Sequence, residues 1–494
     1  MREEGRHRGE EGKGMKGFAV FVVLRFWGRG RRYPTVRIAN LKAKMGGPDL
    51  MQYSYRAKMI EAELGMEVQV QRTTVLNHPA GAGDSREIPL TIFDRFASNI
   101  NIAVLFAFSA PVPSNHQLIH ALSNALLHFP LLTARLSPTH LILPGSGALV
   151  VEATVDGVEL ADILPFKPTP DFLLHHPPTD GPARHVLQIQ LNRFPCGGLV
   201  AAATAHHRIA DGQSMGAFFA AWGRAARGEP IPPPLHDRSW LRPRSPPACE
   251  FDHWDVEFVS DGCIKDFADS YRNSVDPSRI TNVLLHYTGE FLAKLKAEMR
   301  NKKLTTFETL LGHLWRLITA ARGLEEDVKT MMRVTVNGRQ RMRPPVPNEF
   351  FGNLVLNAYP ATAARKLVEG GTEGAAEVVH EAIRKVDGRY FQSVVDFGEV
   401  LRKQGREELV PVYDANEGNV LSPELEVDSW LRFGFEEVDF GSGGRLCGFL
   451  PTWLPWEGLV IFLPAVEGGG GVNAVVTLLE EHAAELRKIS HSLD

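Results

Sequence analysis

The chain has 494 residues, of which 44% are hydrophobic and 23% charged, as is usual for a globular protein with room for two sizeable domains. Its net charge of −4 combines +7 over residues 1–65 with −11 over residues 66–494, and so acidic a body argues against nucleic acid as a partner. The four cysteines, at positions 196, 249, 263 and 447, form no CxxC pair, which argues against a disulfide framework or a zinc cluster and fits the cytoplasm.

Residues 1–65 are predicted to lie outside the folded body. Met66 opens a strand-like run, Glu67–Val75, and would make a natural start, so the preceding residues are interpreted as a disordered extension or an artefact of the gene model. The alternative is a targeting segment built on the apolar run Phe18–Trp27. Arg25 interrupts that run, and the run is shorter than the ~20 residues of a membrane span, so no membrane partner is expected.

The first half of the body is predicted to mix strands with helices. Apolar residues recur at helical spacing over 116–129, which predicts an amphipathic helix. A proline-rich stretch, Pro230–Pro247, then suits a surface crossover. The predicted domains are 66–250, which includes this proline-rich stretch, and 281–494. The crossover that joins the two domains is predicted over 251–280. The other elements predicted in this half are strands at Asn101–Ala110, Ala148–Val155, Val186–Phe194 and Leu199–Ala205, and a helix at Ser214–Arg227.

The second half repeats this plan of strands and helices. Thr305 and Glu308 have the spacing of a capping box in front of a long apolar helix that runs to Ala321. No glycine-rich loop follows a strand and opens a helix, so a Rossmann or P-loop nucleotide site has little support. The remaining predictions are strands at Asn282–Tyr287 and Met331–Asn337, helices at Glu290–Arg300 and Gly374–Tyr390, an extended segment Trp430–Phe440, and a hairpin of Gly458–Pro464 with Val472–Leu478.

The stretch His207–Gly212 places a histidine and an aspartate four residues apart at a predicted strand-to-helix junction. Imidazole titrates near neutral pH and suits general base catalysis. The pattern alone is weak evidence, because the chain has 18 histidines. His207 could instead be a satisfied core histidine, and Asp211 could be a helix cap. A second motif, Asp439–Gly443, lies far downstream and adds weight to the catalytic interpretation.

Taken together, these motifs resemble those of the BAHD acyltransferases, plant enzymes that transfer an acyl group from coenzyme A to an alcohol or amine. The resemblance covers about residues 67–494. It implies an α/β fold of the two-domain chloramphenicol-acetyltransferase kind, with mixed sheets, helices and an active-site channel between the domains, in a monomer. The further segments that carry the resemblance are Phe307–Arg316, Asn337–Arg341, Phe351–Asn353 and Asp428–Trp430.

The resemblance also implies roles for single residues. His207 would be the general base, Asp211 would turn away from substrate to pair with Arg339, and Asp439 would bond Asn353. Acyl-CoA would be a co-substrate, with no permanently bound cofactor and no metal. The residues implied to support the site are Asp211, Arg339, Asn353, Asp439 and Gly441.

The chain departs from the family where the second motif normally has tryptophan, because position 442 is serine. Loss of an indole removes a large packing surface, so the wall of the acyl-CoA channel is expected to be looser or filled by another side chain such as Phe449. This departure also keeps open a non-catalytic protein that only binds CoA or a phenolic compound.

Within the family, four segments are most similar to hydroxycinnamoyl-CoA:amine N-acyltransferases acting on agmatine, putrescine or tryptamine; an O-acyltransferase with an alcohol acceptor is the alternative. A cationic amine needs a carboxylate, and Asp396, Glu399 and Glu426 are the candidates. Thr305 and Thr306 could meet CoA phosphates at a helix N-terminus, although plain capping is the simpler role. The four segments are Ile88–Asp94, Asp180–Pro182, Pro195–Gly197 and Glu426–Leu431.

Overall fold

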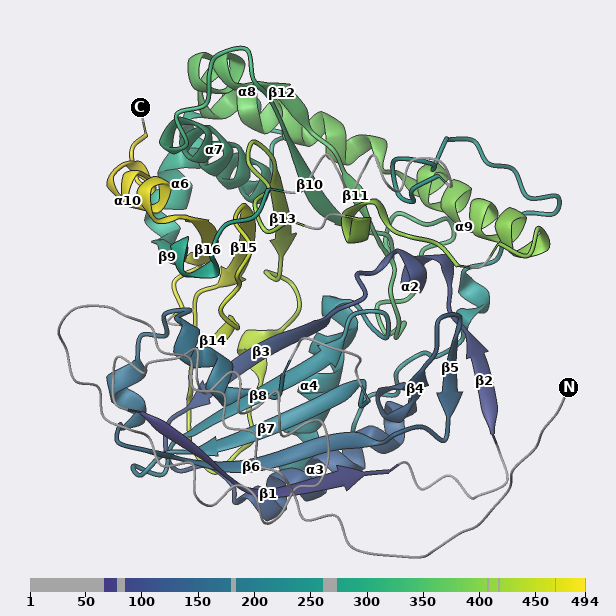
Figure 1. Cartoon of the computed structure of the whole chain (residues 1–494), viewed down its shortest axis with the longest axis vertical. Coiled ribbons are helices and arrows are strands. Elements are labelled where there is room, and N and C mark those ends of the chain that lie inside the picture. Colours follow the sequence, from purple (N-terminus) through teal and green to yellow (C-terminus); the bar gives the residue numbers. More distant parts are fainter. Residues whose placement is uncertain are drawn as a thin grey trace, which may run out of the picture. The chain divides into compact units, whose positions relative to one another are not determined.

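The structure is a computed structural model that describes residues 66–77, 85–178, 184–260, 273–406, 408–415, 418–466 and 468–493 (Figure 1). Predictions for residues 1–65 and for the segment Asp180–Pro182 fall outside these ranges, as does part of the predicted crossover.

The first sheet has six strands in the order β1-β6-β7-β8-β3-β14, and only the β6–β7 pair is parallel. Its outer strand β14 comes from the second half of the chain and pairs with β3, so the two halves share this sheet. The strands are β1 (Glu67–Leu76), β3 (Asn101–Phe108), β6 (Ala148–Asp156), β7 (Leu187–Arg193), β8 (Leu199–His206) and β14 (Leu446–Pro451).

Two helices, α3 (Asn115–His128) and α4 (Gly212–Ala226), cover one face of this sheet (Figure 1). Their apolar sides share one core with the strands, and the indole N–H of Trp222 donates to the carbonyl of Leu118 at 2.9 Å. This contact fixes α4 against α3, so the start of α4 is held in place relative to the end of β8.

The second sheet has the order β11-β10-β13-β15-β16-β9, with β12 also paired to β10. β13 is parallel to both of its neighbours, whereas β15 and β16 form the predicted antiparallel hairpin. The two mixed sheets with their helices confirm the predicted α/β class. The strands are β9 (Ile280–Tyr287), β10 (Lys329–Asn337), β11 (Val355–Ala358), β12 (Ala361–Ala363), β13 (Leu425–Ser429), β15 (Leu459–Pro464) and β16 (Val472–Leu479).

Two helices of the second half, α6 and α7, follow the predictions, whereas α9 and α10 were not predicted. The capping box of Thr305 and Glu308 is present at the start of α7. The helix predicted over 374–390 is wrong in its bounds, because Asp387 caps a new helix there by accepting from the amides of Arg389 and Tyr390. The helices are α6 (Gly289–Glu298), α7 (Thr306–Ala321), α8 (Ala364–Lys385), α9 (Gly388–Lys403) and α10 (Glu480–Ile489).

The prediction of an extended segment over 430–440 is also wrong. Gly434 has a φ of 70°, and the 3-10 helix Phe435–Glu437 follows it, so the chain turns there. A small third sheet has the strand order β2-β5-β4, with β2 (Arg86–Pro89), β5 (His140–Leu143) and β4 (Arg135–Leu136). The short helix α2 (Ile92–Phe96) follows β2 in the sequence and precedes the other two strands. Across the described ranges, no helix has the length and apolar character needed to cross a membrane.

Candidate active site

The histidine turn joins the end of β8 to the start of α4. The backbone N–H of His207 donates to the carbonyl of Ile100 at 3.0 Å, and the side-chain amide of Asn353 donates to the carbonyl of His207 at 3.0 Å. Segments that lead into the two large sheets therefore hold the backbone of this one residue, since Ile100 precedes β3 and Asn353 precedes β11.

The two adjacent histidines have different environments. His206 is buried, and its Nδ1 accepts from the backbone N–H of Arg208 at 3.3 Å. Burial, followed by the charges of Arg208 and His207, lowers the pKa of His206 to about 4, so this ring is neutral at physiological pH. His207 is only partly buried, and its Nδ1 is enclosed with no hydrogen-bond partner among the described residues. Nε2 is thus the nitrogen that a substrate can reach.

Asp211 binds Arg339, which is the partner that the resemblance implied. Two guanidinium nitrogens donate to its carboxylate at 2.7 and 3.0 Å, and the amides of Ser214 and Leu354 donate at 3.0 Å each. Burial by itself would raise the pKa of Asp211, but the charge and hydrogen bonds of Arg339 and the two amides hold it below its usual range. The pair is buried, so it joins the histidine turn to the second half of the chain.

The predicted bond between Asn353 and Asp439 is wrong. The side-chain amide of Asn353 donates to Asp94 at 3.0 Å, and Arg238 pairs with the same carboxylate. Asp439 instead accepts from the amide of Gly441 at 2.7 Å and lies 3.7 Å from Arg227. The physical reason is the length of α4: its 15 residues span ~22 Å, with the histidine turn at one end and the Asp439 loop at the other.

Asp94 is a supporting residue that the sequence reasoning missed. Its side chain caps α2 from the third helical position, because the backbone N–H of Thr91 donates to it at 2.9 Å. The same buried carboxylate orients the Asn353 amide that holds His207. The Thr91-x-x-Asp94 spacing of a capping box was the signal available in the sequence.

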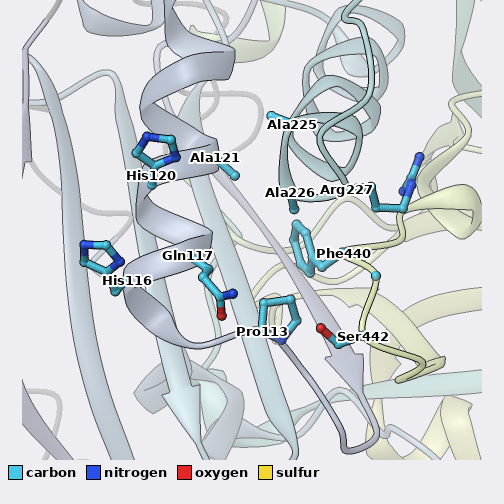
Figure 2. Close-up of a pocket in the computed structure, with 11 residues that line it drawn as sticks. Pro113, His116, Gln117, His120, Ala121, Ala225, Ala226, Arg227, Phe440 and Ser442 are labelled. Carbon is cyan, nitrogen blue, oxygen red and sulfur yellow. The ribbon is translucent and has the colours of Figure 1, made fainter.

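Ser442 lies beside a pocket of about 570 Å³ at the far end of α4. Figure 2 shows Phe440 between α3 and the end of α4, with Ser442 near Pro113. Gln117 of α3 also lines this pocket. Phe449 does not fill this space, because its ring packs on Phe106 and Phe435. The departure from the family pattern is therefore remote from His207 and leaves the histidine turn intact.

Two carboxylates, Asp414 and Asp428, interact electrostatically with His207, and a third, Glu426, interacts with both of them. Asp428 accepts from the hydroxyl of Thr335 at 2.5 Å, and its charge interacts with those of Glu426 and His207. Asp414 interacts with His207 and Glu426 in the same way. Burial is the main cause that raises the pKa of both Asp414 and Asp428 above the usual range.

Two of these three carboxylates are offset by arginines. Arg333 donates to Glu426 at 2.8 Å, and Arg208 lies 3.7 Å from Asp414. Asp428 has no arginine or lysine at ion-pair distance among the described residues. Glu426 and Asp428 are two apart on β13 and so share a face, a signal that was readable in the sequence. Asp414 lies in a 3-10 turn, where no sequence pattern pointed to it.

The other predicted acceptor and CoA residues do not join this group. Asp396 is buried and accepts from the amides of Arg244 and Ala248 at 2.7 and 3.0 Å, so it anchors residues 244–248 to α9. Glu399 bonds Arg402 at 2.8 Å on the same helix. The Thr305 hydroxyl accepts from the amide of Glu308 at 3.2 Å, which is the capping role left open by the sequence. No cluster of three potential metal ligands occurs among the described residues.

Comparison with known proteins agrees with this architecture. The sequence model of the Transferase family matches residues 66–492. Tryptamine hydroxycinnamoyltransferase 2 of Oryza sativa subsp. japonica is 38% identical over 87% of this chain and 100% of its own length. Agmatine hydroxycinnamoyltransferase 1 of the same plant is 39% identical over 79% and 90%, and agmatine coumaroyltransferase-1 of Hordeum vulgare is 38% identical over 82% and 94%.

Solved structures share the fold at low identity. Vinorine synthase aligns with a TM-score of 0.65 at 18% identity, covering 86% of this chain and 98% of that one. F. graminearum TRI101, in a complex with coenzyme A and deoxynivalenol, aligns at 0.64 with 17% identity, covering 82% and 97%. These similarities define the fold as a two-domain α/β architecture. The chain belongs to the Transferase family, that is, to the BAHD acyl-CoA-dependent acyltransferases.

Proposed function

We propose that this enzyme transfers a hydroxycinnamoyl-type acyl group from a CoA thioester to an amine, giving a phenolamide, with His207 as the general base. The relatives at 36–39% identity, which are named for agmatine, putrescine and tryptamine, support this proposal. The observation that carries it is that the charges of Asp414 and Asp428 interact with the partly buried imidazole of His207. Acyl-CoA and amine would reach His207 from opposite ends of the channel that the family resemblance implies.

The chemistry needs one base and no covalent intermediate. The amine nitrogen attacks the thioester carbonyl carbon, Nε2 of His207 takes the proton from that nitrogen, and the imidazolium returns it to the departing CoA sulfur. Ser214 is unsuited to act as a nucleophile, because its hydroxyl oxygen accepts from Arg339 at 2.9 Å and from the amide of Gly352 at 3.1 Å. The turn thus provides a base with no competing nucleophile beside it.

The charges around His207 favour an acceptor that carries a second cation. An amine must be unprotonated to attack, so a monoamine brings no charge in its reactive form, whereas a diamine or a guanidino amine keeps its distal cation. Glu426 and Asp414 are offset by arginines, whereas Asp428 has no such partner among the described residues and its pKa is raised by burial. A cation bound beside Asp428 would favour its charged form. We therefore assign Asp428, with Glu426 beside it, to the distal cation of an agmatine-like or putrescine-like acceptor.

An acceptor panel tests this proposal. The purified protein is incubated with coumaroyl-CoA and agmatine, putrescine, tryptamine or an alcohol, and release of the CoA thiol is measured. We expect kcat/KM to be highest for agmatine or putrescine, lower for tryptamine and lowest for alcohols. A preference for alcohols would support the O-acyltransferase alternative. Thermal stabilisation by CoA without turnover on any acceptor would support the non-catalytic alternative.

A further inference from the structure

Proton transfer to His207 creates an imidazolium whose charge needs compensation. In many catalytic histidines a carboxylate bonds the second ring nitrogen. Here Asp211 is committed to Arg339, and Nδ1 of His207 has no hydrogen-bond partner among the described residues. Any stabilisation of the imidazolium must therefore act through space from a charge nearby.

Asp414 is held against the same backbone segment as His207. Its carboxylate accepts from the backbone N–H of Asn99 at 3.2 Å, while the next residue, Ile100, accepts from the N–H of His207 at 3.0 Å. The carboxylate and the base are thus attached to adjacent residues in front of β3. The side chain of Asp414 is 21% exposed, which limits solvent screening of its charge.

The remaining charges near His207 come from three elements. His206 at the end of β8 is neutral at physiological pH, and Arg208 in the turn opposes a positive imidazolium. Asp428 on β13 favours the imidazolium, with Glu426 nearby and offset by Arg333. Asp428 is assigned above to the acceptor's distal cation, so its charge is compensated when the acceptor is bound.

We propose that Asp414 is a positioning residue that stabilises the imidazolium form of His207 during proton transfer, without touching either substrate. This proposal rests on His207 being the base. It assigns to the 3-10 turn Val412–Ala415 the role that a directly bonded carboxylate has in other catalytic histidines. Burial raises the pKa of Asp414, whereas the Asn99 amide and the charge of Arg208 act in the opposite direction and favour its carboxylate form.

Two substitutions with opposite expected effects test the proposal against a purely structural role. Asp414→Asn removes the negative charge, so kcat falls about tenfold and the acidic limb of the pH–rate profile moves to lower pH, since the imidazolium is less favoured. Arg208→Gln removes the opposing positive charge, so the same limb moves to higher pH. If Asp414 served only to tie its turn to the first sheet through Arg208, both variants would lower the melting temperature and neither would move the limb.

Further variants complete the experiment. Asp414→Glu should restore most of kcat, and KM for the acceptor should change less than twofold in all three variants. Ionisation of the amine is common to every variant, so the ratio of variant to wild-type rate at each pH isolates the enzyme group. If the acidic limbs of the pH–rate profiles of Asp414→Asn and Arg208→Gln moved in the same direction, or did not move, the proposed role of Asp414 would be overturned. Activity that survives in His207→Ala would overturn the proposed function itself, so the two failures are distinguishable.

Discussion

At the scale of single residues, the site depends on how four polar side chains are paired. Asp211 is fully committed to Arg339, which leaves His207 free of a bonded carboxylate. Asp94 orients Asn353, which holds the His207 carbonyl. Motif and resemblance predicted the base and the Asp211–Arg339 pair. They could not predict the partner of Asn353, because that partner depends on which loops lie near each end of α4. Asn353 lies near the histidine turn at the start of α4, and Asp439 lies near the end of α4.

The amine-binding role of Asp428 can be tested by Asp428→Asn. Loss of a charge-assisted contact should raise KM for agmatine by about tenfold or more and leave KM for tryptamine nearly unchanged. In the wild type, KM for agmatine should rise as the pH falls through the pKa of Asp428, which is raised above its usual range, because the carboxylate then loses its charge. An equal change for both amines would contradict the assignment.

The buried pair can be tested by Arg339→Met. This substitution leaves the Asp211 carboxylate buried without its cation, so the free energy of unfolding should fall by about 3 kcal/mol or more in urea denaturation. Arg402→Met is the matched control, since Arg402 is more than half exposed beside Glu399 and its loss should change stability by less than about 1 kcal/mol. Equal effects of the two substitutions would show that Arg339 is not specially required.

At the scale of elements, α4 links the site to the rest of the fold. A Cβ added to Gly216 would lie 1.9 Å from the carbonyl oxygen of Phe433, so only glycine allows the 430–435 turn to approach this helix. Gly216→Ala should therefore destabilise the protein and lower kcat. Gly374→Ala in α8 is the control, because nothing lies within 4 Å of its added Cβ and alanine favours a helix, so the melting temperature should stay constant or rise. A neutral Gly216→Ala would show that this approach is not needed.

Periodicity predicted most regular elements but not the points where they are interrupted. In the second half, the predictions of α6, α7 and the β15–β16 hairpin were confirmed, whereas α9 and α10 were not predicted. The break between α8 and α9 was missed because an aspartate at position 387 is compatible both with a helix cap and with the exposed surface of one continuous helix. The pairing of β14 with β3 joins residues more than 300 positions apart, and no local pattern encodes such a partner.

At the scale of the whole molecule, the family match covers residues 66–492. A protein that starts at Met66 should therefore keep the melting temperature and the kcat of the full chain. Parallel thermal melts and coumaroyl-CoA assays of the two proteins check this. A loss of more than about 10-fold in activity would assign residues 1–65 a part in the folded enzyme.

The pH dependence of stability should follow Asp211. Its pKa is lowered in the folded state, so the stability it contributes is fully present above the pKa of an unfolded aspartate, about 3.9, and is lost as the pH falls through the lower folded value. Acid unfolding followed by circular dichroism should be shallower below about pH 4 for Asp211→Asn than for the wild type. Identical profiles would contradict this assignment.

The most direct test of the account is the single-turnover rate of coumaroyl transfer to agmatine in His207→Gln, a substitution that keeps a polar side chain of similar size but removes the base. We predict that this rate falls by about 1,000-fold while affinity for CoA is retained. A rate within about threefold of the wild type would contradict the assignment of His207 as the general base.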